Sequence, residues 1–185
     1  MVIYLLQTSS TVVKTIALER PSAAQAFRLL EAFECLWRTS RLHANAPTSH
    51  LFANVMPAIL LSQYLLVLEQ GSQKPLGLCT WAKMDKASEY RYLLDPTGLN
   101  KNDWLSGDRL WLIDWIGQPS VNRRMAQFLK AQLLPREVLR TLRVRPNSSK
   151  AFIRSFCGSL IEPSVAQAIL RDYHAEYLRM HRTSS

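Results

Sequence analysis

The hydrophobic positions along the chain change their spacing, from a helical period near the amino terminus to strand-like runs in the middle. A proline that suits the first turn of a helix is followed by Phe27, Leu30 and Trp37 at helical spacing. This pattern predicts an amphipathic helix over residues 21–40. The first twenty residues show no clear period. We expect them to form a loose amino-terminal extension with a short edge strand over residues 11–18.

A second helix, with Leu51 and Val55 on its apolar face, is expected to bend or end near Pro57. Two strand-like runs follow over residues 63–68 and 75–84. A Gln-Gly-Ser segment joins them and is typical of the turn of a β-hairpin.

The rest of the chain alternates between strand and helix signals. The predicted elements are a buried central strand over residues 109–116, a helix over 121–134, strands over 140–145 and 152–156, and a carboxy-terminal helix over 163–181. Together these elements predict an α+β domain, layered in the α/β manner, with one mixed β-sheet of five or six strands flanked by helices. Residues 21–185 are expected to form this single domain.

Composition narrows the class of protein. The 185 residues are 48% hydrophobic and 20% charged, which is the balance of one folded domain and excludes a disordered chain. The three cysteines lie far apart without a CxxC or Cys/His cluster, so neither a metal site nor a disulfide framework is expected. Cys79, inside a strand, is expected to be a buried, inert thiol. We find no signal peptide and no apolar run of membrane-spanning length, and expect a cytoplasmic protein.

Positive charge is concentrated in one part of the chain. Residues 119–154 hold nine Lys and Arg against a single acidic residue, Glu137. Such a field attracts an acidic partner, which means nucleic acid, an anionic membrane surface or an acidic protein, although a solvated basic face is the simpler alternative. The interleaving of basic and aromatic residues that marks RNA-binding domains is absent, so we do not expect nucleic acid as the partner.

Two residues stand out as candidates for chemistry. His43 occupies a loop between two predicted helices, where reactive side chains concentrate, whereas the other three histidines fit structural or solvated positions better. Asp114 lies in the middle of the apolar run Trp-Leu-Ile-Asp-Trp-Ile. Simple alternation places Leu112 and Ile116 on the same face as Asp114, so this face is expected to be partly buried. A partly buried carboxylate can hold an imidazole in one tautomer and stabilise its cation.

Several segments resemble one family, the RTX toxin-activating lysine acyltransferases. The similar segments are residues 36–43 (LWRTSRLH), 51–59 (LFANVMPAI), 79–82 (CTWA), 103–116 (DWLSGDRLWLIDWI), 142–144 (LRV) and 173–176 (YHAE). They follow the family's order and span residues 29–181. The segment 103–116 is the longest and the most specific.

The resemblance implies a fold like that of the GNAT acetyltransferases and a homodimer that acts in the cytoplasm. The implied reaction moves a fatty acyl group from acyl carrier protein to the ε-amino group of internal lysines in an RTX-type protoxin, with no bound cofactor and no metal. The family's essential histidine and aspartate fall on His43 and Asp114. Ser40 and Asn54 match further family positions and are expected to contribute to substrate binding.

The chain also departs from the family pattern. Arg41, Ala44 and Ala46 stand where the family commonly has proline, arginine and tryptophan, and the amino-terminal extension is longer than usual. These changes leave open an acyltransferase whose acceptor is not an RTX toxin. A basic nucleic-acid-binding module is a further alternative, and within the enzymatic reading His43 acts either as a general base or as the acyl acceptor itself.

The glycines bear on the acyl donor. GNAT enzymes that use coenzyme A hold its pyrophosphate with a Q/R-x-x-G-x-G/A loop, and none of the six glycines of this chain stands in a G-x-G or G-x-A pattern. A carrier-protein donor needs no such loop. Acyl carrier proteins are strongly acidic, so a basic docking face suits them.

Overall fold

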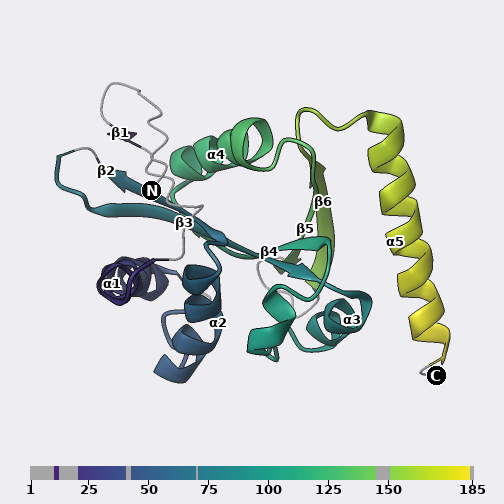
Figure 1. Ribbon diagram of the computed structural model, residues 1–185, viewed down its shortest axis with the longest axis horizontal. Coiled ribbons are helices and arrows are strands. Elements are labelled where there is room, and N and C mark those ends of the chain that lie inside the picture. The colour runs from purple at the N-terminus through teal and green to yellow at the C-terminus, as the bar shows by residue number, and fades with distance from the viewer. Residues whose placement is uncertain (1–10, 13–20, 41–42, 70, 145–150, 184–185) are drawn as a thin grey trace.

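The computed structural model describes residues 11–12, 21–40, 43–69, 71–144 and 151–183 (Figure 1). The helices are α1 (Ala23–Thr39), α2 (Thr48–Leu60), α3 (Lys86–Leu94), α4 (Pro119–Phe128) and α5 (Pro163–Thr183), with a 3₁₀ turn η1 (Lys101–Trp104) and a π-helical turn η2 (Leu129–Leu133) that prolongs α4. The strands are β1 (Thr11–Val12), β2 (Tyr64–Glu69), β3 (Pro75–Met84), β4 (Arg109–Gly117), β5 (Val138–Val144) and β6 (Ala151–Cys157). These elements confirm the predicted α+β class.

The six strands form one mixed sheet in the order in which they occur along the chain. Neighbouring strands are antiparallel except for β4 and β5, which run parallel and are joined through α4, since parallel neighbours need a crossover connection. The parallel pairing is short, because only Leu110–Leu112 of β4 pair with Leu139–Thr141 of β5. The second half of β4, beyond Leu112, therefore does not pair with β5.

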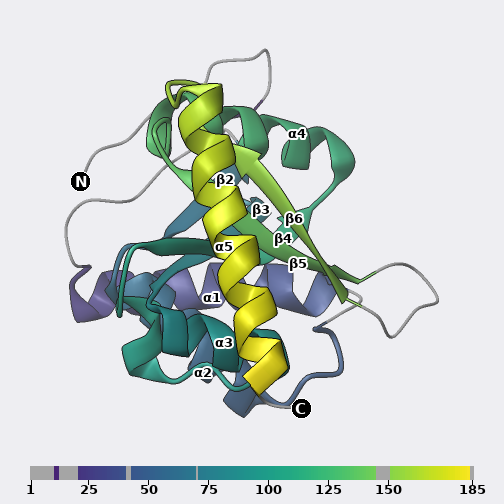
Figure 2. The ribbon, with the colours of Figure 1, turned by 90° about the vertical axis from the view of Figure 1, so that its right-hand side faces the viewer.

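The helices cover the two faces of the sheet unequally. Figure 1 shows α1, α2 and α3 on one face and α4 on the other, and Figure 2 shows α5 crossing β5 and β6. Three clusters of buried side chains fill the interior. One joins the sheet to α4, one joins it to α1 and α2, and one joins it to α3 and η1. Among the described helices, none combines the length and apolar character needed to cross a bilayer.

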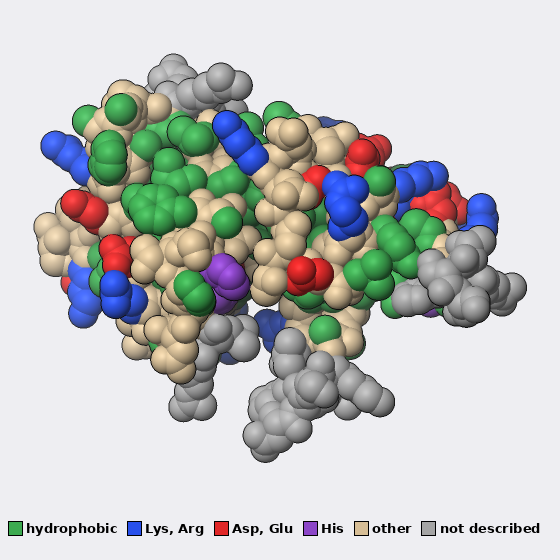
Figure 3. All heavy atoms as spheres, turned by 90° about the horizontal axis from the view of Figure 1, so that it is seen from below, with side chains coloured by type: hydrophobic (Ala, Val, Ile, Leu, Met, Phe, Trp, Pro, Cys, Tyr) green, Lys and Arg blue, Asp and Glu red, His purple; other side chains and the backbone are tan. Residues whose placement is uncertain are grey.

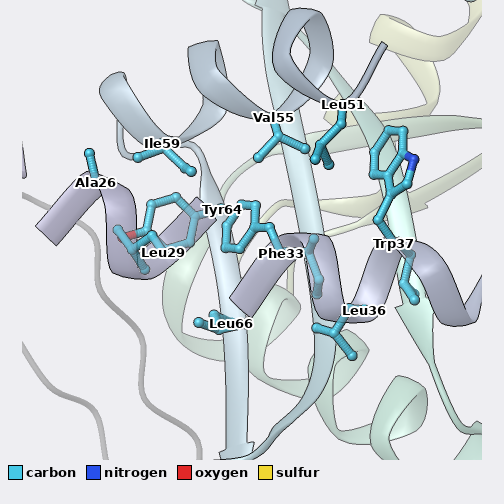
Figure 4. Packing of buried hydrophobic residues seen from close by; sticks show 12 residues of the cluster. Ala26, Leu29, Phe33, Leu36, Trp37, Leu51, Val55, Ile59, Tyr64 and Leu66 are labelled. Carbon is cyan, nitrogen blue, oxygen red and sulfur yellow. The ribbon is translucent and has the colours of Figure 1, made fainter. Parts of the chain in front are cut away.

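Buried side chains pack α1 and α2 against each other and against the sheet. Phe33 of α1 and Val55 of α2 are fully buried. The ring of Phe33 packs edge-on against that of Tyr64 of β2, with 5.2 Å between the ring centroids, and Figure 4 shows the two rings side by side. Burying a side chain of this size contributes about 1.5–3 kcal/mol. Ser22 caps α1 through a reciprocal capping box with Gln25, which fixes where the helix begins. Both helices are thereby held against the sheet, one on each side of His43 in the chain.

Most of the predicted elements are confirmed, with three differences. The helix α2 does not end near Pro57 but continues to Leu60, because buried Val55 and Ile59 hold it against the sheet and offset the hydrogen bond that the proline cannot make. The helix α3 and the turn η1 were not predicted. Of the predicted edge strand over residues 11–18, the structure describes only Thr11–Val12, which pairs with β2. The rest of the amino-terminal extension lies outside the described residues.

Candidate active site

The structure brings His43 and Asp114 together. His43 Nε2 lies 3.3 Å from Asp114 Oδ1, and the two side chains are 20% and 3% exposed. One group comes from the loop between α1 and α2 and the other from the middle of β4, so the contact joins a helical layer to the sheet. A buried carboxylate next to an imidazole nitrogen favours a proton on that nitrogen and stabilises the imidazolium form.

The other ring nitrogen of His43 faces Ser40. Ser40 Oγ lies 2.8 Å from His43 Nδ1, within hydrogen-bonding distance. With the Nε2 proton directed at Asp114, Nδ1 carries the lone pair and accepts a hydrogen bond from the Ser40 hydroxyl. The backbone also links Ser40 and His43. The His43 N–H donates to the Ser40 carbonyl at 3.0 Å, which closes a turn and brings the imidazole next to the Ser40 side chain.

Trp37 forms the wall behind the imidazole. Its ring lies in the last turn of α1, with its centroid 4.0 Å from that of His43 and a 40° angle between the two planes. Trp37 is buried in the cluster that joins α1 and α2 to the sheet. The imidazole is thus confined on one side by an indole that the core itself holds in place.

Asp114 is held by Thr80 of the adjacent strand. The Thr80 hydroxyl donates to Asp114 Oδ2 at 2.8 Å and accepts from the Asp114 backbone N–H at 3.1 Å. Both residues are buried. One carboxylate oxygen of Asp114 therefore contacts His43 and the other accepts a hydrogen bond from Thr80, and these two contacts fix the plane of the carboxylate. Sequence reasoning missed Thr80, because a threonine in a strand carries no signal of such a role.

Simple alternation predicted that Leu112 and Ile116 share the face of Asp114, and this prediction is wrong for Leu112. Cys79 pairs with Trp115 while Trp81 pairs with Leu112, so β4 has one more residue than β3 between these pairs, which is the signature of a β-bulge. Leu112 consequently packs toward α4, whereas Ile116 packs toward α1 and α2. Asp114 shares the face of Ile116 but not that of Leu112.

Two neighbouring groups stay protonated. Burial raises the pKa of the Cys79 thiol well above its ordinary value, and the charge of Asp114 raises it further. Burial and the charge of Asp114 likewise raise the pKa of Tyr92. Cys79 therefore has the character of an inert core thiol, as expected, because the reactive form is the thiolate.

Asn54 lies apart from this arrangement. Its side-chain amide donates to the His50 carbonyl one turn earlier in α2, at 2.9 Å. Among the described residues, no hydrogen bond joins Asn54 to His43 or Asp114. His50 and His174 are exposed, and the side chain of His181 lies outside the described residues. Within the described parts of the chain, no group of three His, Cys, Asp or Glu side chains could hold a metal ion.

A cavity of about 660 Å³ adjoins the His43 side of the sheet. Ser40 lies on its wall, together with residues from the end of β4, the start of β3 and the first turn of α4; these residues include Leu76, Trp115, Ile116, Gly117, Gln118 and Val121. Ser40, whose hydroxyl contacts the imidazole, therefore borders a space of the size that small ligands occupy.

A buried carboxylate on an imidazole can support an enzyme that removes a proton from its substrate, acyltransferases among them. Curated relatives carry names of that class. The chain is 36% identical over 143 residues to a protein-lysine myristoyltransferase (HlyC) of Escherichia coli, covering 77% of this chain and 82% of the relative. It is 35% identical over 159 residues to the leukotoxin-activating lysine-acyltransferase LtxC of Aggregatibacter actinomycetemcomitans, covering 86% and 93%.

A third relative, a protein-lysine palmitoyltransferase (CyaC) of Bordetella bronchiseptica, is 36% identical over 161 residues, or 86% of this chain and 85% of the relative. The model of the RTX toxin acyltransferase family matches residues 22–155. The chain belongs to this family and is an acyltransferase. The matched range contains His43, Ser40 and Asp114, and it begins after the amino-terminal extension.

Proposed function

We propose that the protein transfers a fatty acyl group from the thioester of an acyl carrier protein to the ε-amino group of internal lysines in an RTX-type protoxin. The contact between His43 Nε2 and Asp114 Oδ1 is the observation that carries this proposal. The names of the curated relatives support the acceptor chemistry, since each of those proteins is named for lysine acyl transfer.

In the proposed reaction the lysine nitrogen attacks the thioester carbonyl, a carbon–nitrogen bond forms and the carbon–sulfur bond breaks. The lysine attacks as the neutral amine, and its nitrogen must give up one proton as the carbon–nitrogen bond forms, because the amide keeps a single hydrogen on that nitrogen. His43 takes that proton at Nδ1, while Asp114 stabilises the imidazolium that results. The departing thiolate then takes the proton from His43, which returns the imidazole to its starting form.

Ser40 stands between the cavity and His43 Nδ1. An amine in this cavity reaches the base either directly or through the Ser40 hydroxyl, which accepts the amine proton as it passes its own to Nδ1. The second route lets the imidazole stay against Trp37 and Asp114 throughout the reaction. Ser40 is thereby proposed to bind the incoming amine and to relay its proton, and Asn54 is proposed as a substrate-binding residue on the family resemblance alone.

The donor is assigned to a carrier protein rather than to coenzyme A on two grounds. The sequence lacks the G-x-G or G-x-A pattern of a pyrophosphate loop, and it concentrates basic residues between positions 119 and 154. A donor of this type places the reaction in the cytoplasm. We further propose that the protein works as a homodimer, as the family resemblance implies.

The acceptor is proposed to be a protein. α2 follows the His43 loop directly and exposes Phe52 and Leu60, at 48% and 39%. Figure 3 views the molecule from below the orientation of Figure 1 and shows hydrophobic side chains gathered on that face. Exposed apolar patches of this kind mark surfaces that receive other proteins. Because Arg41, Ala44 and Ala46 depart from the family around His43, an acceptor other than an RTX toxin is the second candidate.

The test is the intact mass of a candidate protoxin after incubation with acyl-loaded carrier protein and the purified enzyme. We expect one fatty acyl mass per modified lysine, and a rate lowered about 10²–10⁴-fold in His43→Gln. An unmodified acceptor with the unsubstituted enzyme would refute the proposed protoxin substrate, and the same assay on other lysine-containing proteins addresses the second candidate.

The role of His43 as a base is tested separately, without an acceptor. The enzyme is mixed with acyl-loaded carrier protein alone, quenched and weighed. We expect no acyl-enzyme. An acyl-enzyme that forms under these conditions and disappears in His43→Ala, but persists in Ser40→Ala, would replace general-base catalysis by an acyl-histidine intermediate.

A further inference from the structure

A second cavity lies on the face of the sheet that α4 covers, between α4 and the β5–β6 ribbon. It measures about 740 Å³ and is lined by four cationic side chains, Arg123, Lys130, Arg143 and Arg154. Its lining contains no acidic residue. We refer to it as the basic groove.

The helical wall of the groove follows from sequence spacing. Pro119, Asn122, Arg123, Ala126 and Lys130 all line the groove. Their intervals of three, one, three and four residues place them on one side of α4 and its continuation. The opposite side of the same helix, with buried Met125 and Phe128, packs on the sheet.

The strand wall follows from register. Arg154 of β6 pairs with Thr141 of β5, and Arg143 lies two residues further along β5. Residues two apart on one strand share a face, as do directly paired residues on neighbouring antiparallel strands. Arg143, Arg154 and Thr141 therefore lie together on the face of the ribbon that is turned toward α4.

The four cations of the groove have no carboxylate partner among the described residues. The Lys and Arg side chains with a salt bridge elsewhere in the described ranges include Arg38, Lys83, Lys86, Arg91, Arg109 and Arg140. Four like charges around one cavity repel one another in the free protein, and an anionic ligand removes that repulsion.

The basic groove and the cavity that Ser40 lines share one wall residue, Trp115. Trp115 follows Asp114 on β4 and belongs to the lining of both cavities. The first turn of α4 also contributes to both, through Asn122 on one side and Val121 on the other. The short pairing of β4 with β5 leaves the second half of β4 free of its parallel neighbour at this point.

We propose that the basic groove binds the phosphodiester of the 4′-phosphopantetheine arm of the acyl carrier protein, with the arm leading past Trp115 to the thioester beside Ser40 and His43. This inference rests on the proposed function, because it assigns a place to the donor of that reaction. Arg143 and Arg154 hold the phosphate by charge-assisted hydrogen bonds, for which the planar guanidinium is well suited.

The dimensions of the groove favour a single phosphorylated arm over nucleic acid. A volume of about 740 Å³ lies in the range of small-ligand pockets, which is roughly 300–1,000 Å³. Specific nucleic-acid complexes instead bury about 1,000 Å² or more of protein surface along an extended face. Side chains that hold the phosphate also take the place of the glycine-rich backbone loop that the sequence lacks.

The test compares binding of holo-carrier protein, apo-carrier protein, 4′-phosphopantetheine and pantetheine by calorimetry, with the full chain and without an acceptor. The variant is Arg143→Gln with Arg154→Gln. The control with the same loss of charge is Arg28→Gln with Arg171→Gln, two exposed residues on α1 and α5 that line neither cavity. Because all four residues are exposed, both proteins are expected to fold, and thermal unfolding checks this.

We expect the unsubstituted protein and the control to prefer 4′-phosphopantetheine over pantetheine, and the holo-carrier over the apo-carrier, by about 10- to 100-fold. The groove variant should lose that preference. The inference would be overturned if the unsubstituted protein bound 4′-phosphopantetheine and pantetheine equally, or if the groove variant kept the preference. Displacement of 4′-phosphopantetheine by random duplex DNA would overturn it as well. Failure of lysine acylation with the phosphate preference intact would count against the proposed function alone.

Discussion

The hydroxyl of Thr80 contacts Asp114 twice, as a donor to the carboxylate at 2.8 Å and as an acceptor from the backbone N–H at 3.1 Å. Thr80 is fully buried, so neither contact is shared with water. Because the β-bulge in β4 turns Asp114 out of the regular alternation, the strand alone does not fix the direction of this carboxylate. Thr80 supplies that constraint from the neighbouring strand.

Removing the hydroxyl should therefore affect both stability and activity. Thr80→Val keeps the shape but leaves a buried carboxylate oxygen and a backbone N–H without their partner, which costs about 1–3 kcal/mol. We expect the free energy of unfolding in urea to fall by this amount. The acylation rate should fall about tenfold or more, since a loosened Asp114 orients His43 less well.

Thr80→Ser is the matched control, because it retains the hydroxyl and loses only a methyl group. It should restore most of the rate that Thr80→Val loses. If Thr80→Val lowers stability but leaves the acylation rate and its pH profile unchanged, Thr80 is structural only.

Ser40 and His43 are expected to act along one proton path, and a double-mutant cycle tests this. Ser40→Ala removes the hydroxyl that contacts Nδ1 and should lower the rate about tenfold or more. In the His43→Gln background the same substitution should change little, because residues that act as a unit are not additive in their effects. Equal effects of Ser40→Ala in the two backgrounds would show that the hydroxyl works independently of the imidazole.

Trp37 offers a substitution that separates packing from hydrogen bonding. Its Nε1 is buried without a hydrogen-bond partner among the described residues, so Trp37→Phe sacrifices only volume. We expect that variant to lose less than about 1.5 kcal/mol of stability, whereas Trp37→Ala should lose about 3–5 kcal/mol. Trp37→Phe should also keep the ring that lies behind His43, and with it most of the acylation rate. A phenylalanine variant as unstable as the alanine variant would contradict this account.

The sequence predicted the elements whose burial follows a simple period. α1 and β4 are of this kind, because their apolar residues recur at helical spacing or form an unbroken run. α3 was missed for a physical reason. Two of its three buried residues, Ser88 and Glu89, are polar, and their burial depends on partners in other elements. Glu89 is paired with Arg109 and Arg140 and accepts a hydrogen bond from Trp111.

Only part of the candidate site could be predicted from the sequence. His43 could be singled out by its loop and Asp114 by its place in an apolar run. The contacts that hold the two residues could not be predicted. The Thr80 hydrogen bond and the β-bulge depend on strand register, which a hydrophobic pattern does not specify. Ser40 was identified through resemblance, and its position on Nδ1 follows only from the turn that the chain makes after α1.

Glu176 ties α5 to the rest of the molecule in a way that depends on pH. Its carboxylate lies 2.5 Å from Lys86 Nζ and is also paired with Arg109 of β4. The hydrogen bonds from Lys86 and then from Arg109 hold the pKa of Glu176 below its ordinary value of 4.5. The folded protein therefore binds fewer protons here than the unfolded chain, so this contribution to stability is complete above pH 4.5 and is lost as the pH falls through the lowered pKa.

Glu176→Gln should lower the free energy of unfolding at pH 7, and the difference from the unsubstituted protein should shrink as the pH falls below 4.5. Urea unfolding at several pH values measures that difference directly. Asp103, whose pKa is also lowered, titrates in the same range in both proteins and so cancels from the comparison. A difference that stays constant from pH 7 down to pH 3 would mean that the charge of Glu176 contributes nothing to holding α5 in place.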